Sequence, residues 1–186
     1  MNRITKDIGP YVKVTFKRQL PYSIPGQCVK LDGKWFAIYE VNPGDFSILV
    51  NKNSHYAEND PQEISEPLGE GFTASLCKRA IVVGGGTGIG AVMPVIKNRN
   101  RHGLSTDVIF YTRGDISPIR LDQATIGMCR NVIFWDTTKQ GRPSTPLEPL
   151  VDKQAESTIF VAGPKSLVTA TEEAARNYNF DCYTNF

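Results

Sequence analysis

Residues 79–94 read RAIVVGGGTGIGAVMP and predict a strand, a tight turn and a helix in immediate succession. Residues 80–83 are apolar and mostly β-branched, and residues 89–96 carry apolar side chains at helical spacing. The glycines between them permit positive φ and a close backbone approach, while free N–H groups and the helix dipole face outward. This arrangement is typical of a loop that cradles phosphate groups. A glycine-rich turn that serves packing alone is the alternative.

The spacing of the glycines in this stretch favours a dinucleotide-binding loop over a Walker loop. Gly86, Gly88 and Ala91 fit the pattern G-x-G-x-x-A of dinucleotide-binding folds. A Walker loop is excluded, because no Gly-Lys-Ser/Thr sequence follows. The dinucleotide pattern also expects an acidic residue at the end of the next strand, whereas that strand ends here on Thr112 and Arg113.

Composition and charge indicate an ordinary globular protein rather than a nucleic-acid-binding one. The 186 residues are 40% hydrophobic and 22% charged, with a net charge of +2 and no long basic run. The one local basic cluster is expected to be a solvated helix end in preference to an anion site, since cations favour the C-terminal end of the helix dipole. It comprises Lys97, Arg99, Arg101 and His102.

The cysteines and the absence of long apolar runs predict a reduced, cytoplasmic protein without a metal centre. The four cysteines lack C-x-x-C spacing, so neither a zinc site nor an iron–sulfur cluster held by this chain alone is expected. No apolar run reaches 18 residues and the first residues lack a signal-peptide core, so we expect no membrane span. His55 and His102 stand alone and are expected at the surface.

The first half of the chain predicts a small antiparallel β-barrel. Apolar residues alternate in period two over 11–17, 28–31, 35–39 and 46–50, and Pro, Gly and Asn turn signals separate these runs. Residues 51–71 are predicted to form a loop. The aromatic residues Trp35, Phe36 and Phe46 are expected in the core in preference to a partner face.

From residue 79 onward the pattern changes to that of an α/β domain. Strand-like runs recur at intervals of about 25 residues, which predicts crossover connections and a five-stranded parallel sheet. The expected strands are 80–83, 107–112, 131–135, 158–162 and 180–183. Ser117-Pro118 and Gly163-Pro164 are expected to cap helices, the second over 166–177. The predicted domains are therefore residues 1–76 and 77–186.

Three loops are expected to meet at the ligand-binding edge of this sheet. Ligands of open parallel sheets bind beyond the carboxyl ends of the strands, which brings together residues 84–90, 112–117 and 162–166. Arg113 follows the second strand, where a guanidinium suits a 2′-phosphate on an adenosine ribose. A structural salt bridge of Arg113 with Asp115 or Asp107 is the alternative.

Four short motifs together resemble the ferredoxin–NADP reductase superfamily. They are Pro25-Gly26-Gln27, PLGEGF at 67–72, GGTGI at 85–89 and Ala162-Gly163-Pro164, and they look most like the electron-transfer subunit type of dihydroorotate dehydrogenase. The resemblance covers nearly the whole chain. It implies a flavin-binding barrel followed by a domain that binds NAD(P)H, with hydride passing from nicotinamide to flavin and electrons passing singly to a partner protein.

The resemblance also implies roles for particular residues. The dinucleotide pyrophosphate would lie on the loop after the first α/β strand, and the adenosine 2′ position beside the end of the next strand. Tyr39 would stack on the flavin isoalloxazine, and the loop before the last helix would lie on the nicotinamide side. The cofactor-binding residues implied in this way are Tyr39, Gly85, Gly86, Thr87, Gly88, Ile89, Thr112, Arg113, Gly163 and Pro164.

Several departures from the family pattern concern the flavin. The flavin signature R-x-Y-S is matched by Ala37-Ile38-Tyr39-Glu40, which lacks the arginine and places an acid where a hydroxyl is expected. Leu20-Pro21-Tyr22-Ser23 precedes the Pro-Gly-Gln motif and so lies in the wrong order. No G-x-x-S element follows, Ala162 replaces the family's cysteine, and the C-terminal four-cysteine cluster is missing. FAD or FMN is the implied flavin, and these departures leave three alternatives: the flavin is FMN, it is bound loosely, or it is supplied by a partner subunit.

Two functions remain open from the sequence. The first is an NAD(P)H-dependent flavin oxidoreductase that transfers electrons to a protein partner. The second is a non-catalytic nucleotide-binding sensor or assembly subunit that has lost flavin binding. A dehydrogenase acting on two substrates is less well supported, because no Ser-Tyr-Lys or His-Asp set lies near the predicted strand ends. The sequence identifies no catalytic residue and no metal ligand.

Overall fold

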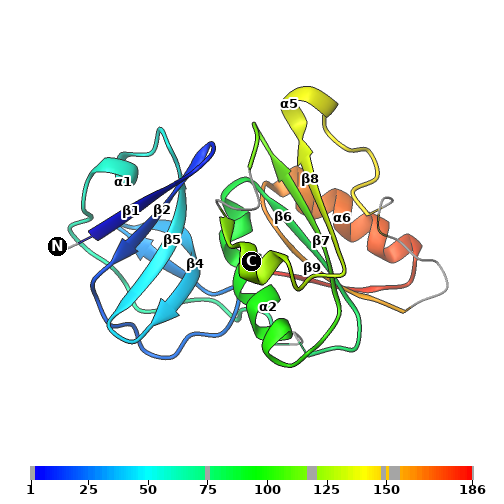
Figure 1. The fold of residues 1–186 in the computed structure, drawn as a ribbon, viewed down its shortest axis with the longest axis horizontal. Helices are drawn as coiled ribbons and strands as arrows, with labels where there is room; N and C mark the ends of the chain where they lie inside the picture. Colours follow the sequence, from blue (N-terminus) through cyan, green and yellow to red (C-terminus); the bar gives the residue numbers. More distant parts are fainter. Residues whose placement is uncertain (1–2, 74–75, 117–120, 148–149, 151–155, 186) are drawn as a thin grey trace.

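The computed structural model describes residues 3–73, 76–116, 121–147, 150 and 156–185, and it contains two five-stranded sheets (Figure 1). The first sheet is antiparallel and barrel-like, with the strand order β1-β2-β5-β4-β3. Its strands are β1 (Arg3–Ile8), β2 (Tyr11–Phe16), β3 (Cys28–Leu31), β4 (Lys34–Asn42) and β5 (Asp45–Asn51). The predicted β-barrel class is thereby confirmed, with β1 as an additional strand.

Local sequence explains this sheet. The β3–β4 hairpin turns at Asp32 (φ 47°) and Gly33 (φ 80°), the positive-φ pair that a two-residue turn requires. Phe46 is fully buried and its ring lies 5.3 Å from that of Phe16. Trp35, in contrast, is 50% exposed beside the Lys30 ammonium, so the expectation of a core position holds for Phe46 and is wrong for Trp35. Strand β1 escaped prediction because its middle residues are polar and exposed.

The second sheet is parallel throughout and confirms the predicted five-stranded α/β arrangement. Its order is β10-β9-β6-β7-β8, so the order of the chain reverses beside β6. The strands are β6 (Ala80–Gly85), β7 (Thr106–Thr112), β8 (Asn131–Asp136), β9 (Thr158–Ala162) and β10 (Asp181–Thr184). The expected cap at Ser117-Pro118 lies outside the described residues. Pro164 is the N-cap residue of the last helix, which begins at Lys165.

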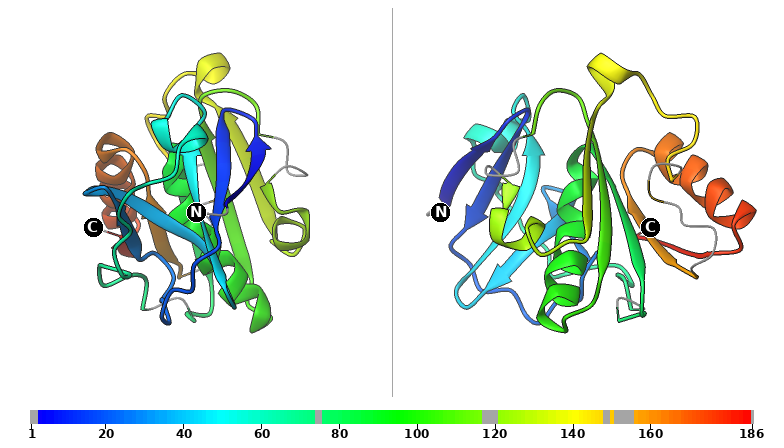
Figure 2. Two further views of the ribbon diagram at one scale, coloured as in Figure 1. Left: turned by 90° about the vertical axis from the view of Figure 1, so that its left-hand side faces the viewer. Right: turned by 45° about the vertical axis from the view of Figure 1, so that its right-hand side comes forward.

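Helices cover both faces of the parallel sheet. Helix α2 (Ile89–Arg101) lies between this sheet and β4, and α6 (Lys165–Asn177) covers the opposite face (Figures 1 and 2). The shorter helical segments are α1 (His55–Glu58), the 3₁₀ turn η1 (Gly86–Gly88), α4 (Gln123–Ile126) and α5 (Thr137–Gln140). None of the described helices has the length and apolar character needed to cross a membrane.

The basic cluster at the end of α2 is not the solvated patch that its sequence predicts. Arg99 is fully buried, and its guanidinium donates to the carbonyl oxygens of Cys77 and Ser105, each at 2.7 Å. Lys97 forms ion pairs with Glu40 and Asp122. Only Arg101 and His102 of this cluster are exposed, so the prediction is wrong for the first two residues.

A single hydrophobic cluster joins the two sheets. Ile8, Tyr11, Tyr39 and Leu49 of the antiparallel sheet belong to the same buried cluster as α2 and the α2-facing side of the parallel sheet. Gly90 shows how closely the parts approach, because a Cβ added there would lie 3.3 Å from the Cβ of Leu49. The division at residue 76 stays a prediction, since the core itself does not stop there.

Candidate functional site

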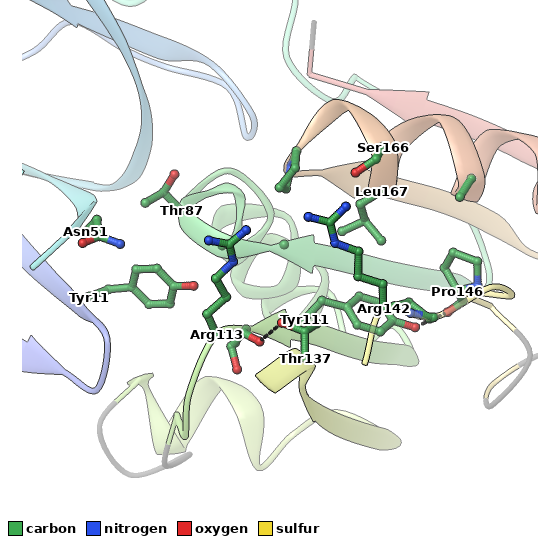
Figure 3. Close-up of a pocket in the computed structure, with 16 residues that line it drawn as sticks. Tyr11, Asn51, Thr87, Tyr111, Arg113, Thr137, Arg142, Pro146, Ser166 and Leu167 are labelled. Atoms are coloured by element: carbon green, nitrogen blue, oxygen red, sulfur yellow. Dashed lines mark hydrogen bonds between the residues drawn. The ribbon is translucent and has the colours of Figure 1, made fainter. Parts of the chain in front are cut away.

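A cavity of about 420 Å³ opens at the carboxyl edge of the parallel sheet, beside the point where the strand order reverses (Figure 3). Both sheets contribute to its wall. Its lining residues are Tyr11, Asn51, Gly85, Gly86, Thr87, Tyr111, Thr112, Arg113, Thr137, Arg142, Pro143, Pro146, Pro164, Ser166, Leu167 and Ala170. Six of the ten residues predicted as cofactor-binding are among them: Gly85, Gly86, Thr87, Thr112, Arg113 and Pro164.

The turn between β6 and α2 presents backbone and a hydroxyl to the cavity. Gly86 has φ 57°, a conformation that side chains disfavour, and the nearest atom to a Cβ added there would be the Tyr11 hydroxyl at 3.8 Å. Thr87 is exposed, and α2 starts two residues later with its positive dipole end at this turn. The turn can therefore accept an anionic group from the cavity side.

The remaining predicted glycines serve packing. A Cβ on Gly88 would lie 2.5 Å from the carbonyl of Ala162, and one on Gly163 would lie 3.0 Å from Gly85. Ile89 is fully buried in the core. Gly88, Ile89 and Gly163 are thus not on the cavity wall, so the packing interpretation applies to them, and phosphate binding by Gly86 and Thr87 stays a prediction.

The loop after β7 is fixed to the loop after β8. The Thr137 hydroxyl donates to the Thr112 carbonyl at 2.7 Å, and the Gly114 N–H donates to Asp136 at 2.9 Å. Hydrogen bonds from Thr138 and Gly114 lower the pKa of Asp136 below its ordinary value. This carboxylate is therefore charged at neutral pH, and its acceptor oxygen is already used by these loop N–H groups. These bonds hold Arg113 at the mouth of the cavity.

The structure does not support the salt-bridge alternative for Arg113. Asp107 lies at the amino end of β7, far from Arg113 at the carboxyl end, and it pairs there with Arg79 and Arg130. Within the described part of the chain, no ion pair joins Arg113 to Asp107 or Asp115.

Arg142 is a cavity residue that the sequence analysis missed. It follows α5 in the loop after β8, where the Trp135 indole N–H donates to the Gly141 carbonyl at 2.9 Å. Further along the same loop, the Tyr111 hydroxyl donates to the Pro146 carbonyl at 2.7 Å. The rule that selected the other three loops would have found this one, because it also leaves the carboxyl end of a strand.

The antiparallel sheet contributes Tyr11 and Asn51, which no local signal could have revealed because their role depends on how the two sheets dock. Tyr11 is 4% exposed, and its hydroxyl lies near the backbone of Arg113. Burial raises the pKa of Tyr11, so the phenol remains neutral at physiological pH. Tyr11 therefore ties the barrel to the wall of the cavity.

The residues that match the flavin signature do not fit a flavin stacked on Tyr39. Tyr39 is 1% exposed, its hydroxyl donates to the Leu121 carbonyl at 3.2 Å, and the Lys13 and Lys97 ammonium groups lie 4.9 and 5.5 Å from its ring centroid. Tyr39 borders a second cavity of about 170 Å³, which is below the roughly 300–1,000 Å³ of typical ligand pockets. Ala37 offers no cation for a flavin phosphate. Tyr39 thus lies apart from the other predicted site residues.

Glu40 occupies the position of the signature's serine and binds two lysines instead. Its carboxylate pairs with Lys13 at 2.6 Å and with Lys97 of α2, which links β2, β4 and the helix. Burial tends to raise the pKa of Glu40, but the hydrogen bonds from the two lysines outweigh it, and the net pKa is lowered. An ion-pair network thereby takes the place of the hydroxyl that the family pattern expects.

Replacing Glu40 with glutamine is expected to lower the free energy of unfolding by about 1–3 kcal/mol at pH 7, because the partly buried Lys13 ammonium loses its ion-pair partner and Lys97 keeps only Asp122. A lowered folded-state pKa contributes stability that is present above the ordinary pKa and is lost as the pH falls through the folded value. The variant should therefore lose less stability than the parent between about pH 5 and pH 3, measured by urea denaturation. Glu66→Gln is the control, since Glu66 is 64% exposed and pairs with Arg18 at 3.6 Å. Equal effects of the two changes would contradict the network.

Comparison with known proteins agrees with this architecture. No protein-family model matches the chain. In sequence, it is 28% identical over 107 residues to a Methanopyrus kandleri protein described as "Probable dihydroorotate dehydrogenase B (NAD(+)), electron transfer subunit"; the match covers 56% of this chain and 41% of the relative's length. In structure, an NADH-dependent reduced ferredoxin-NADP oxidoreductase has a TM-score of 0.75 at 16% identity, over 99% of this chain and 74% of that one. The chain shares the ferredoxin reductase-like fold.

A second solved structure shows which portion of the superfamily fold is present. The FAD/NAD-binding domain of a nitric oxide dioxygenase from Vibrio cholerae has a TM-score of 0.75 at 11% identity, over 98% of this chain and 96% of that domain. The chain therefore shares the fold of that domain over nearly its whole described length. The relatives are described as oxidoreductases and electron-transfer proteins, so the alternative of a non-catalytic sensor is not favoured.

Proposed function

We propose that the 420 Å³ cavity binds a nicotinamide dinucleotide and that the chain acts as the NAD(P)H-binding component of an electron-transfer oxidoreductase with a protein partner. The observation that carries the proposal is the position of the Gly86 turn. It opens into the cavity at the carboxyl edge of β6, beside the reversal of strand order, where open α/β sheets bind nucleotides.

The chain's own residues divide the site into parts with different chemistry. The Gly86 and Thr87 turn would hold the pyrophosphate through N–H groups, the Thr87 hydroxyl and the dipole of α2. Pro164 and Ser166, at the start of α6, would border the nicotinamide half. The nicotinamide itself supplies the hydride chemistry when bound, while the protein would position the ring and restrict the access of water to it.

The electron acceptor is assigned to a partner protein. Tyr39, Glu40 and Ala37 do not fit a flavin held in the manner of the family signature, as shown by the burial of Tyr39 and the pairing of Glu40. The curated relative is described as an electron transfer subunit, which supports a multi-protein arrangement. Incubation of the purified chain with FAD or FMN followed by gel filtration tests this assignment: co-elution of stoichiometric flavin would contradict it.

Blocking the cavity tests dinucleotide binding directly. Ser166 is exposed on the first turn of α6, so Ser166→Trp should fill the cavity without disturbing the core. We expect isothermal titration calorimetry to show binding of NADH or NADPH to the parent and at least tenfold weaker binding to the variant. Thr169→Trp is the matched control, because Thr169 is exposed on the same helix and does not line the cavity. Absence of binding of both dinucleotides to the parent would overturn the proposal.

A further inference from the structure

We propose that strand β8 is the interface through which two copies of this chain associate, with the two β8 strands paired edge to edge and antiparallel. The strand ends the parallel sheet, and among the described strands it pairs with β7 only (Figure 2, left). Its sequence, NVIFWD over residues 131–136, has four consecutive large apolar residues and contains no lysine, proline or glycine. Such an edge offers unpaired backbone groups and apolar side chains to a strand that matches it.

The other sheet edges in the described part of the chain are protected in ways that β8 is not. The free side of β3 is covered by residues 64–68, because the Cys28 N–H donates to the Leu68 carbonyl at 2.9 Å and the Leu68 N–H donates back to the Cys28 carbonyl at 2.7 Å. Strand β1 carries three charged residues among its six, and β10 spans four residues and begins with the exposed Asp181. Coverage, charge and short length are common means of blocking edge pairing.

The apolar side chains of β8 are half-buried on both faces of the sheet. Val132 and Phe134 pack against the cluster on the α2 side, and Ile133 and Trp135 pack against the cluster on the α6 side. All four side chains keep intermediate exposure, whereas the neighbouring strand β7 is buried along its whole length. A further strand on the free side would cover them on both faces at once. The matching strand must therefore be apolar at consecutive positions, as β8 itself is.

Register and charge select a second copy in the antiparallel orientation. Arg130 precedes the strand and Asp136 ends it, so the two ends carry opposite charges. When two copies pair about a two-fold axis at Ile133, Val132 of one copy lies opposite Phe134 of the other, and Arg130 lies opposite Asp136. A parallel copy would place like charges side by side. It would also leave a further edge open, whereas the two-fold arrangement closes.

Contacts within the chain leave this charge pattern in place. Arg79 and Arg130 both pair with Asp107, so the amino end of β8 keeps an excess of positive charge. At the carboxyl end, Asp136 pairs with Lys139 at 3.7 Å, but the Lys139 side chain is 75% exposed. Solvent screens such an exposed pair, and it compensates little of the carboxylate charge.

This association leaves the 420 Å³ cavity open. The cavity lies beyond the carboxyl ends of the strands, and none of residues 131–136 lines it. Antiparallel pairing places the two cavities of the dimer at opposite edges of one continuous sheet. The inference is therefore independent of the proposed function, and each can fail without the other.

Sedimentation equilibrium tests the association. We expect the mass to rise with protein concentration from the 20.6 kDa of one chain toward twice that value. Ile133→Lys places two ammonium groups opposite each other at the axis and removes apolar contact, so it should weaken the association about tenfold. Ile4→Lys is the matched control and should leave the association unchanged, because Ile4 is 56% exposed on the β1 edge. A mass that stays at that of one chain up to about 100 μM, or an association that Ile133→Lys does not weaken, would overturn the inference.

Hydrogen exchange provides a second test on the unmodified chain, so the outcome does not depend on whether Ile133→Lys folds. Peptides that contain residues 131–136 should exchange more slowly at high protein concentration than at low concentration, because the outward N–H groups of β8 become paired. Peptides that contain residues 3–8 of β1 should exchange equally at both concentrations. Protection of β1 in place of β8, or exchange of β8 that stays constant while the mass doubles, would contradict the assigned interface.

Discussion

Replacement of Gly88 with alanine is expected to lower the free energy of unfolding by about 3 kcal/mol, the upper end of the usual range for an overpacked site. The added Cβ would lie 2.5 Å from the carbonyl carbon and oxygen of Ala162 and 2.6 Å from the Cα of Gly163. These are backbone atoms of the neighbouring loop and cannot rotate away. Relief requires β6 and β9 to separate at their carboxyl ends, where they are paired through Gly84 and Ala162.

The same change should also weaken dinucleotide binding, because it displaces the turn that carries Gly86 and Thr87. Urea denaturation measures the stability, and calorimetry on the folded fraction measures the binding. Gly90→Ala, two residues further on in α2, is the control: its Cβ would lie 3.3 Å from the Leu49 Cβ, which a shift of a few tenths of an ångström relieves, and alanine favours helix. We expect it to change stability by less than about 1 kcal/mol. If Gly88→Ala lowered the stability as little as Gly90→Ala, the result would contradict the close contact between the Gly88 turn and the loop at Ala162 and Gly163.

Replacement of Arg99 with leucine is expected to destabilise the protein by about 3–5 kcal/mol, because several buried hydrogen-bond acceptors lose their donor at once. The Arg99 side chain is fully buried, and its Nε donates to the Thr106 hydroxyl at 2.9 Å in addition to the two carbonyl contacts described above. Leucine fills part of the volume but leaves the carbonyls of Cys77 and Ser105 without these donors. Such unsatisfied groups are costly when they are shielded from water.

Arg101→Leu provides the comparison for this prediction. Arg101 lies two residues further along α2 and is exposed, so its loss should change stability by no more than about 0.5 kcal/mol. Both variants retain the helix-forming character of the segment, and denaturation curves with equal slopes allow their midpoints to be compared. A similar small effect for both would show that the buried network around Arg99 contributes little.

The fold was predictable where hydrophobic periodicity is strong. Residues 80–83 and 158–162 pair side by side as β6 and β9, because continuous apolar runs identify strands buried on both faces. Periodicity also placed α2 and α6. It could not identify β1, whose exposed polar residues pair with β2 through backbone hydrogen bonds alone and leave no apolar alternation.

The site was predictable only in the parts that follow from strand ends. The Gly86 turn and Arg113 were found in this way, whereas Tyr11 reaches the cavity through docking of the two sheets, which no local pattern reports. Arg99 and Arg101 are alike in sequence, and only the direction of each around the helix decides that one is buried. Tyr39 matched a family motif, yet its burial depends on Leu121, a residue more than 80 positions away.

The buried cluster shared by the two sheets opposes any movement of the antiparallel sheet relative to the parallel one. Hinge bending about the connection near residue 76 would have to pull Leu49 and Tyr39 away from α2 and expose both surfaces to water. Ligand entry is therefore confined to adjustments of the loops that carry Arg113 and Arg142. The protein partner of the proposed function would therefore meet a cavity whose two walls share one core, and any change of shape during the encounter would fall to the partner's own surface.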